Sequence, residues 1–429
     1  MTYQQAIEYI HSVVWKGSRP GLSRITELLH ALGDPQDKLK FIHVAGTNGK
    51  GSFCAMTESV LRASGLRTGL FISPYIKQFN ERICYCGKPI SDEDLTEVTA
   101  YVRPFADAMI DSPTEFELIT AIGLVYFLRK GCDVVVLETG MGGRLDSTNV
   151  IRDPLLTVIT GIALDHTAFL GDTVEAIAAE KAGIIKKGAP MLWGGRDAAA
   201  RRVIEQKAAE AGVRFVAAED TPVTVSEMTL SGTCVSYGAY ENIRIPLLGT
   251  YQPQNLSCVL AGLALLREAG LPITEESIRA GLASVRWRGR FEKLCQDPLI
   301  LSDGAHNPEG VAAAVASIKH YFGTERVLLI TGVMADKDYV GMVRDLAPVV
   351  ARAFCLTPDN PRALDSAAFA AAFVAQGIPA QGYPSVREAV AAAVQTARES
   401  GVPLISLGSL YMYAEVTAVL EEMGVIEAE

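Results

Sequence analysis

The sequence predicts an α/β protein with two domains. The first is a P-loop-type domain with a mainly parallel sheet and a small antiparallel insert; the second is a Rossmann-like α/β domain. Three observations support this. Short apolar runs alternate with helical patterns almost from end to end, which is typical of parallel sheets flanked by helices. The chain has 429 residues, 49% of them hydrophobic, enough for more than one core. A glycine-rich turn at 45–52 separates a strand-like run from a helical pattern.

The first domain is expected to span residues 1–290. Apolar periodicity predicts its strands at 41–44, 68–72, 133–137 and 155–162. The same signal predicts its helices at 1–15, 53–63, 115–129, 255–269 and 274–283. Residues 213–248 change character, with short β-rich pieces and glycine turns, which indicates an antiparallel hairpin insert.

The second domain is expected to span residues 298–429, after a linker region that contains Arg286, Arg288 and Arg290. About 130 residues suffice for a compact doubly wound domain. Its predicted strands lie at 299–302, 326–331, 353–356 and 404–407. Its predicted helices lie at 308–321, 366–376, 386–398 and 411–423.

Composition excludes several classes of protein. The net charge of −10 disfavours a nucleic-acid-binding protein, which normally has a basic surface. Eight scattered cysteines without a metal-binding spacing indicate free thiols in a reducing compartment. Residues 1–15 lack the pattern of a signal peptide, and no apolar run is long enough to span a membrane. We therefore expect a cytoplasmic protein.

The turn Gly46-Thr47-Asn48-Gly49-Lys50-Gly51-Ser52 has the features of a phosphate-binding loop. Its glycines allow backbone N–H groups to approach phosphate oxygens, and the following helix adds positive potential at its N-terminus. Lys50 adds a charge and Ser52 a possible Mg²⁺ ligand. The match to the usual pattern is loose, because Val44 holds the first glycine position and Gly51 separates lysine from serine. A glycine-rich turn without function is the alternative.

Three further side chains follow predicted strands or helices of the first domain. Glu138 ends one strand, and His166 follows another, so both could converge with Ser52 on a cation. The alternatives are an acid that caps a turn and a structural histidine. Lys181 is near a helix end, where the helix dipole alone would favour a lysine.

The segment Asp303-Gly304-Ala305-His306-Asn307-Pro308 follows the first strand of the second domain. Asn307 is a natural N-cap and Pro308 a natural first helical residue. Helix capping does not account for Asp303 or His306, which are placed where ligands bind in open α/β sheets.

Together these motifs resemble the folylpolyglutamate synthases, often bifunctional with dihydrofolate synthase in bacteria and related to the Mur ligases. The resemblance covers nearly the whole chain. It rests on residues 46–52, Ser73-Pro74-Tyr75, 138–149, Leu164-Asp165-His166, 180–183, 289–292, 303–308 and Gly408-Ser409-Leu410-Tyr411. Gly51, which separates Lys50 from Ser52 and departs from the usual phosphate-loop pattern, is typical of this family.

The resemblance implies a role for each motif. The ATP phosphates would be held by Gly46, Thr47, Asn48, Gly49, Lys50, Gly51 and Ser52, with further nucleotide contacts from Asn255, Arg290 and Asp303. Two Mg²⁺ ions would be served by Ser52, Glu138, His166 and Lys181, of which Lys181 resembles the family's carbamylated lysine. Folate would be bound by Ser73, Pro74, Tyr75, Arg82 and Phe116, and glutamate by His306 and Ser409. Lys50, Lys181 and His306 would act in catalysis.

Two positions depart from the family pattern. Tyr75 stands where histidine is common, and Arg288 stands before Gly289 where proline is common. Neither affects ATP use, but both leave the finer substrate preference open.

The activity implied is the ATP-dependent addition of L-glutamate to a folate, to dihydropteroate, or to both, by a monomer. A Mur-type peptidoglycan ligase is the alternative, although most of those carry a whole domain before the loop, and here about 44 residues precede it. A GTPase would need an Asn-Lys-x-Asp motif, which the sequence lacks. A nucleotide-binding protein that is not an enzyme would not need the second domain.

Overall fold

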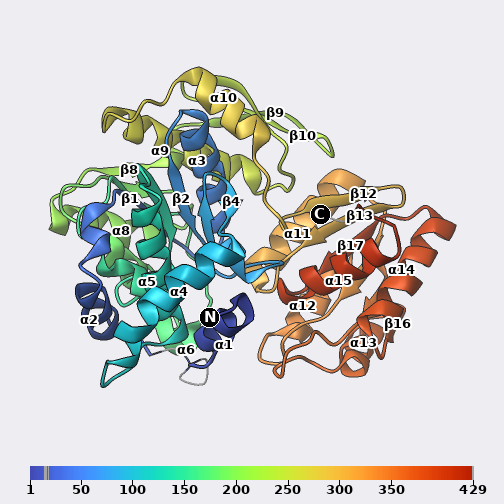
Figure 1. The fold of residues 1–429 in the computed structure, drawn as a ribbon. Helices are drawn as coiled ribbons and strands as arrows, with labels where there is room; N and C mark the ends of the chain where they lie inside the picture. Colours follow the sequence, from blue (N-terminus) through green and yellow to red (C-terminus); the bar gives the residue numbers. More distant parts are fainter. Residues whose placement is uncertain (14–16, 18, 428–429) are drawn as a thin grey trace. The chain divides into compact units, whose positions relative to one another are not determined.

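The computed structural model describes residues 1–13, 17 and 19–427. The chain forms two compact units (Figure 1). Unit 1 contains residues 1–225, 235–245 and 253–285; unit 2 contains residues 226–234, 246–252 and 286–429. The sequence placed the end of the first domain at 290. In the structure unit 1 ends at residue 285, and two short segments before it, 226–234 and 246–252, belong to unit 2.

Unit 1 is built on an eight-stranded sheet with the order β4-β3-β2-β5-β1-β6-β7-β8. Strands β2, β5, β1, β6, β7 and β8 run parallel to one another, and β3 and β4 add an antiparallel edge. Their bounds are β1 Phe41–Ala45, β2 Thr68–Phe71, β3 Ile83–Tyr85, β4 Lys88–Pro89, β5 Val134–Glu138, β6 Leu156–Ile159, β7 Met191–Trp193 and β8 Phe215–Ala217. The central strands are buried on both faces, as continuous apolar runs require.

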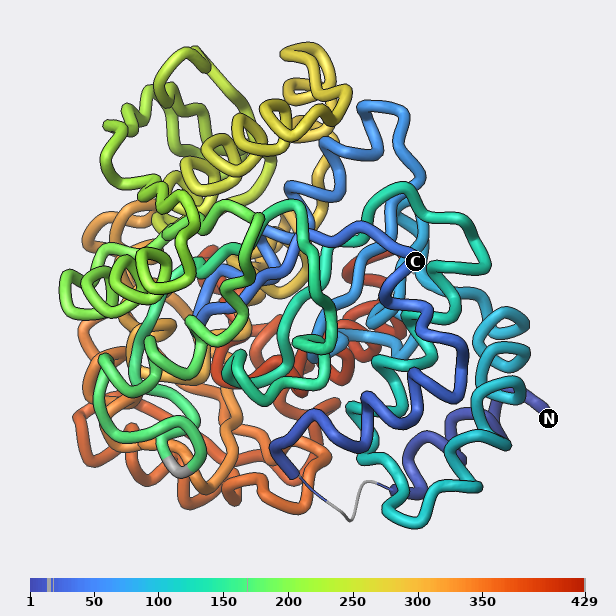
Figure 2. The backbone as a smooth tube through the Cα atoms, turned by 90° about the vertical axis from the view of Figure 1, so that its left-hand side faces the viewer, coloured from blue at the N-terminus to red at the C-terminus, as the bar shows by residue number. Residues whose placement is uncertain are grey.

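Helices cover this sheet. Their bounds are α1 Tyr3–His11, α2 Ser23–Ala31, α3 Lys50–Ala63, α4 Asp92–Asp107, α5 Glu115–Arg129, α6 Thr167–Leu170, α7 Val174–Lys181, α8 Ala198–Ala211, α9 Gln252–Glu268 and α10 Glu275–Ser284. α1 packs beside α4 and α5, and both views show the first helix against the light-blue α4 (Figures 1 and 2). The first helix is shorter than the predicted 1–15, of which residues 14 and 15 lie outside the described part of the chain.

The predicted insert is a small antiparallel sheet with the order β11-β10-β9. Its strands are β9 Val223–Thr229, β10 Gly232–Tyr237 and β11 Tyr240–Ile245. The alternating burial along β11 is what a strand with one solvated face requires.

Unit 2 has a six-stranded sheet with the order β12-β13-β17-β14-β15-β16. Among the described strands of this sheet, the edge pair β12–β13 is antiparallel and the other pairs are parallel. The strands are β12 Glu292–Gln296, β13 Leu299–Asp303, β14 Val327–Thr331, β15 Val350–Cys355, β16 Ala380–Gly382 and β17 Leu404–Leu407. The helices are α11 Pro308–Phe322, α12 Tyr339–Leu346, α13 Ser366–Ala375, α14 Val386–Ser400 and α15 Tyr411–Glu422.

Both faces of this second sheet carry apolar side chains. Leu301, Leu329 and Ile405 form a core with α11, α12 and α13. The neighbouring residues of the same strands point to the other face, where Ile300 and Leu328 pack against α14 and α15. This alternation along each strand produces the doubly wound arrangement that the sequence predicts, and the fold class is confirmed.

The helix after the phosphate-loop sequence begins at Lys50, three residues before its predicted start. Gly49 precedes it in a left-handed conformation, which glycine adopts without strain, so the loop turns directly into the helix. Among the described residues, every helix is too short or too polar to traverse a lipid bilayer.

Candidate active site

The turn between β1 and α3 leaves no room for side chains at two of its glycines. At Gly46, whose φ is +152°, a Cβ atom would lie 2.1 Å from Oγ1 of Thr160. At Gly49, whose φ is +85°, it would lie 2.7 Å from Oδ1 of Asn255. The backbone is therefore bare where a phosphate would approach, and Asn255 contacts the loop.

Hydrogen bonds hold this loop to the segment that follows β6. The Thr47 amide donates to the Gly161 carbonyl at 2.8 Å. The Thr160 hydroxyl donates to the Asn48 carbonyl at 2.7 Å. The Thr47 hydroxyl oxygen accepts from the Ala163 amide at 3.1 Å. The loop shape is thus fixed by the protein before any ligand binds.

Two lysines converge on one carbonyl oxygen of the loop. Nζ of Lys50 donates to the Gly46 carbonyl at 3.0 Å and to the Thr47 carbonyl at 3.2 Å. Nζ of Lys181, at the end of α7, donates to the same Gly46 carbonyl at 2.8 Å. Burial, aided by the positive charge of Lys50, lowers the pKa of Lys181 to about 7. Lys181 is therefore a buried amine that loses its proton near neutrality.

Glu138, the last residue of β5, is a buried carboxylate beside the loop. The strand register pairs it with Val44 of β1, and its Oε2 accepts from the Ser73 amide at 3.2 Å. Burial raises the pKa of the Cys54 thiol well above its usual range, with Glu138 raising it further and Lys50 opposing. Glu138 and Lys50 are therefore both close enough to Cys54 to affect the pKa of its thiol. This is expected if the loop and the end of β5 form one site.

The structure offers oxygen donors for a magnesium ion. Ser52 is buried in the first turn of α3, and Glu138 supplies a carboxylate. Mg²⁺ binds through one or two carboxylates together with phosphates and water, so this donor set fits the ion. Within the described part of the chain, no three His, Cys, Asp or Glu side chains are grouped to hold a metal by themselves. Phosphate oxygens would have to complete the coordination.

His166 is exposed and has a left-handed backbone, with φ +50°, at the N-terminal end of α6. The next helix, α7, begins at Val174 and is capped by the Thr173 hydroxyl, which accepts from the Ala176 amide. The metal role of His166 stays a prediction.

The predicted folate-side residues gather beyond the end of β2. The Arg82 guanidinium donates to the Ser73 hydroxyl at 3.3 Å. It also lies over the Tyr75 ring, 5.1 Å from its centroid, and over Phe79, 5.7 Å from its centroid. Pro74, which lies between Ser73 and Tyr75 in the sequence, is exposed. A planar cation stacked on aromatic rings is suited to hold a flat, polar ligand.

Phe116, in the first turn of α5, lies against the loop that follows β5. A Cβ atom at Gly140 would be 2.6 Å from Cζ of Phe116. Its ring centroid is 6.0 Å from that of Phe71, the last residue of β2. The structure therefore brings Phe116 to the same end of the sheet as Ser73 and Glu138.

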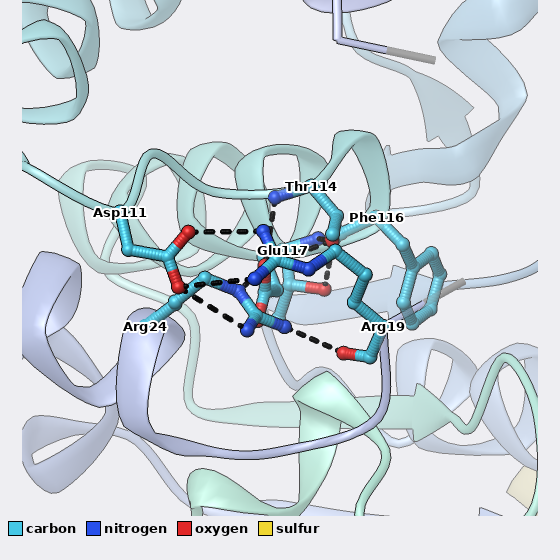
Figure 3. Close-up of polar contacts among 7 residues, drawn as sticks. Arg19, Arg24, Asp111, Thr114, Phe116 and Glu117 are labelled. Atoms are coloured by element: carbon cyan, nitrogen blue, oxygen red, sulfur yellow. Dashed lines mark hydrogen bonds and ion pairs between the residues drawn. The ribbon is translucent and has the colours of Figure 1, made fainter. Parts of the chain in front are cut away.

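A polar cluster holds the start of α5 in place (Figure 3). The Thr114 hydroxyl and the Glu117 carboxylate form a capping box. Oε2 of Glu117 also pairs with Nε of Arg24 at 3.0 Å, and both side chains are buried. The Arg24 guanidinium reaches the Arg19 carbonyl and lies 3.6 Å from Asp111. The Arg24–Glu117 ion pair thus ties α2 to α5, the helix that carries Phe116.

Unit 2 presents Asp303 at the end of β13. Its Oδ2 accepts from the Tyr251 hydroxyl at 3.0 Å and from the Phe291 amide at 2.8 Å; its Oδ1 accepts from the Ala305 amide at 2.8 Å. Burial raises the pKa of the Asp303 carboxyl, and Arg290 and the amide donors oppose this. The carboxylate therefore shapes the turn itself, while its nucleotide contact stays a prediction.

His306 and Ser409 follow adjacent parallel strands of unit 2. The register pairs Asp303 of β13 with Leu407 of β17, so the two turns emerge at one edge of the sheet. Nδ1 of His306 is 2.8 Å from the Gly304 carbonyl. A Cβ at Gly304 would meet Leu410 at 2.1 Å and a guanidinium nitrogen of Arg290 at 2.8 Å.

Sequence reasoning missed the Arg24–Glu117 pair and the role of Tyr251. The Thr114-x-x-Glu117 spacing is a capping-box signature that could have indicated the helix start. Nothing local could have paired Arg24 with a carboxylate 93 residues away.

Comparisons with known proteins agree with this geometry. Residues 44–263 match the Mur ligase middle domain and residues 289–409 match the Mur ligase glutamate ligase domain. The chain is 38% identical to a folylpolyglutamate synthase of Lacticaseibacillus casei, over 98% of this chain and 99% of that one. It is 41% identical to a dihydrofolate synthase/folylpolyglutamate synthase of Bacillus subtilis, over 84% and 86%. The solved structure of Escherichia coli FolC in complex with DHPP and ADP superposes with a TM-score of 0.86 at 29% identity, covering 99% of both chains.

The cluster in Figure 3 leads to a stability prediction. Substitution Arg24→Met should lower the free energy of unfolding by about 3–5 kcal/mol, because Glu117 would remain as a buried charge without its partner. Urea unfolding followed by circular dichroism measures this. Arg19→Met is the matched control: it removes an exposed ion pair with Asp111 and should change stability far less. Equal effects of the two substitutions would contradict the buried-pair interpretation.

Proposed function

The chain belongs to the Mur ligase family, in its folylpolyglutamate synthase and dihydrofolate synthase group, and we propose that it joins L-glutamate to a folate at the expense of ATP. The observation that carries the proposal is the preformed loop, with bare glycines and Lys50, beside the carboxylate of Glu138. That arrangement suits a nucleotide with its phosphates and metal ion. The acceptor is a reduced folate, dihydropteroate or both, and the experiment below compares the two.

The first step activates a carboxylate, which is a poor acyl donor. An oxygen of the folate carboxylate attacks the γ-phosphorus of ATP; the bond to the bridging oxygen breaks, and ADP leaves with its electron pair. The product is an acyl phosphate. The Lys50 ammonium and the loop amides face the charge that develops on the phosphoryl oxygens, which lowers the barrier.

The second step makes the amide. The glutamate amine attacks the acyl carbon, the carbon–oxygen bond to phosphate breaks, and the amine loses a proton. We assign His306 and Ser409 to the glutamate side, because they extend from adjacent strand ends of unit 2. The domain that holds ATP would span residues 1–290 and the glutamate-ligase domain residues 298–429.

Ser52, Glu138 and His166 would serve two Mg²⁺ ions, and Lys181 would help to hold the second. Bound Mg²⁺ would neutralise charge on the transferred phosphoryl group. For Lys181 we propose carbamylation: its neutral amine adds to CO₂, forming an N–C bond and releasing one proton. An amine with a pKa of about 7 is unprotonated often enough for this at neutral pH.

The remaining assignments complete the proposal. The folate side is formed by Ser73, Pro74, Tyr75, Arg82 and Phe116. Asn255, Arg290 and Asp303 serve the nucleotide. The enzyme acts as a monomer in the cytoplasm, where its cysteines, all free, would remain reduced.

The direct test is ADP release by the purified protein with ATP, Mg²⁺ and glutamate. We expect it to require a pterin-containing acceptor, with dihydropteroate and tetrahydrofolate tested separately. Turnover with a UDP-sugar peptide acceptor instead would establish the Mur-type peptidoglycan alternative.

Lys50→Ala should reduce ligation by about 100-fold or more, because it removes a charge contact in phosphoryl transfer. The protein should still fold, since the Lys50 side chain is only partly buried and its amine donates to loop carbonyls. Steady-state rates and circular dichroism measure the two effects. Lys187→Ala, at an exposed position, is the control. Retention of a tenth of the activity would argue against the phosphate role.

Carbamylation of Lys181 should give a ¹³C carbamate signal in protein equilibrated with labelled bicarbonate. Only the neutral amine reacts, so at fixed dissolved CO₂ the signal should grow as pH rises through about 7 and fade below it. Lys181→Met should abolish the signal, whereas Lys187→Met should keep it. A signal that grows only near pH 10 would mean that the carbamate is on an ordinary exposed lysine.

His306→Ala should separate the two chemical steps. The variant should still form acyl phosphate, trapped as a hydroxamate by hydroxylamine, yet transfer it poorly to glutamate. If hydroxamate and amide fall together, His306 does not belong to the glutamate side alone. Asn307→Ala, which removes the cap of α11, is the control for general disturbance of this turn.

A further inference from the structure

A buried chain of polar side chains in unit 1 has no part in the reaction proposed above. It consists of His43 in β1, Thr148 in the 3-10 helix Ser147–Val150, and Asp146; we refer to these three as the relay. Nε2 of His43 is 2.8 Å from Oγ1 of Thr148, and that hydroxyl is 2.6 Å from Oδ1 of Asp146. His43 and Thr148 are fully enclosed and Asp146 is nearly so.

The protons along the relay can be assigned. Burial, with a smaller contribution from the charge of Lys186, lowers the pKa of His43 to about 3, so its ring is neutral and carries one N–H. Burial raises the pKa of Asp146, and hydrogen bonds from the Thr148 hydroxyl and from the amides of Met141 and Thr148 oppose this. Because all three groups donate to the Asp146 oxygens, the group is an accepting carboxylate, and the single hydroxyl proton of Thr148 points to Asp146. The Thr148 oxygen must then accept from Nε2–H of His43. Nδ1 of His43 is left bare and buried without a hydrogen-bond partner.

Asp146, at the other end of the relay, binds backbone amides of the loop that follows β5. Oδ2 of Asp146 accepts from the Met141 amide at 2.8 Å. Oδ1 also accepts from the Thr148 amide at 3.0 Å. One carboxylate thus joins both ends of the segment 141–148, and its orientation determines the shape of the loop of residues 140–146, here called the glycine loop.

The glycine loop has close neighbours on two sides. Gly140 meets the ring of Phe116, as described above. At Gly143 a Cβ atom would lie 2.7 Å from the carbonyl oxygen and 2.9 Å from Cα of Lys181. The Arg144 amide donates to the Glu180 carbonyl at 2.8 Å, which fixes the same end of α7. A shift of this loop would therefore move both the ring and the lysine backbone.

We propose that His43 is a positioning residue, which acts through Thr148 and Asp146 to hold the glycine loop so that Phe116 and Lys181 are placed together. The roles of Phe116 and Lys181 in this inference rest on the proposed function. The relay itself rests on the hydrogen-bond geometry alone. It joins the central strand β1, which leads into the phosphate loop, to the folate side of the site.

The first test needs no activity. The ¹⁵N chemical shifts of the His43 imidazole should show the Nε2–H tautomer from pH 5 to 9, and Thr148→Val should alter the Nε2 shift. Observation of the Nδ1–H tautomer would overturn the relay, whatever the enzyme catalyses.

The second test compares substitutions that keep or remove one hydrogen bond. Thr148→Val preserves shape but loses the hydroxyl; it should raise the KM for the folate about fivefold and weaken the Lys181 carbamate signal. The KM for MgATP should stay within about twofold, because the phosphate loop has its own bonds to residues 160–163. Thr148→Ser and His43→Gln, which keep a hydroxyl and a donor near Nε2, should restore wild-type values, whereas His43→Leu should not.

Two outcomes would overturn the inference: equal behaviour of Thr148→Val and Thr148→Ser, or a parallel rise of both KM values, as general loosening of β1 would give. Failure of the proposed function is distinguishable. In that case the wild-type protein ligates glutamate to no folate, while the tautomer measurement still decides whether the relay exists.

Discussion

The carbonyl oxygen of Gly46 is the point on which the candidate site depends. It accepts from Lys50 and from Lys181, so two amines that repel each other are held at one backbone atom. This arrangement requires a residue without a side chain, since Thr160 fills the space that a Cβ would need. It also accounts for the low pKa of Lys181, because burial and the neighbouring ammonium both disfavour a second positive charge.

Parallel strands explain why residues far apart in sequence meet near this atom. The carboxyl ends of β2, β5, β1 and β6 lie at one edge of the sheet, so Ser73, Glu138, the phosphate loop and Thr160 follow one another across it. The same rule places His306 and Ser409 together in unit 2. The chemistry in each unit is therefore arranged by strand order, and the loops supply the side chains.

Elements are predicted correctly from the sequence where the pattern that specifies them lies within a few neighbouring residues. α5 has the predicted bounds, and the phosphate loop lies between the predicted strand and helix. Contacts such as Arg24–Glu117 depend on tertiary packing, and no spacing encodes them. A single predicted boundary near residue 290 does not account for residues 246–252, which belong to unit 2. In that unit the Tyr251 hydroxyl donates to Asp303. The spacing of apolar residues cannot predict this bond, because a tyrosine just before a helix has the pattern of an ordinary core residue.

Glycines account for much of the packing around the candidate site that sequence patterns do not predict. Each glycine of the loop after β5 is in contact with a different neighbour: Gly140 with the Phe116 ring, Gly142 with Leu170 and Gly143 with the backbone of Lys181. The glycine content of this segment does not by itself identify these neighbours. The structure shows a loop packed between the Phe116 ring and the end of α7, with the Asp146 carboxylate bonded to the amides of Met141 and Thr148. Close packing of this kind has few alternative arrangements, so we expect the Phe116 ring and the backbone of Lys181 to move together. The missing side chains at Gly140 and Gly143 are what bring the loop this close to both neighbours.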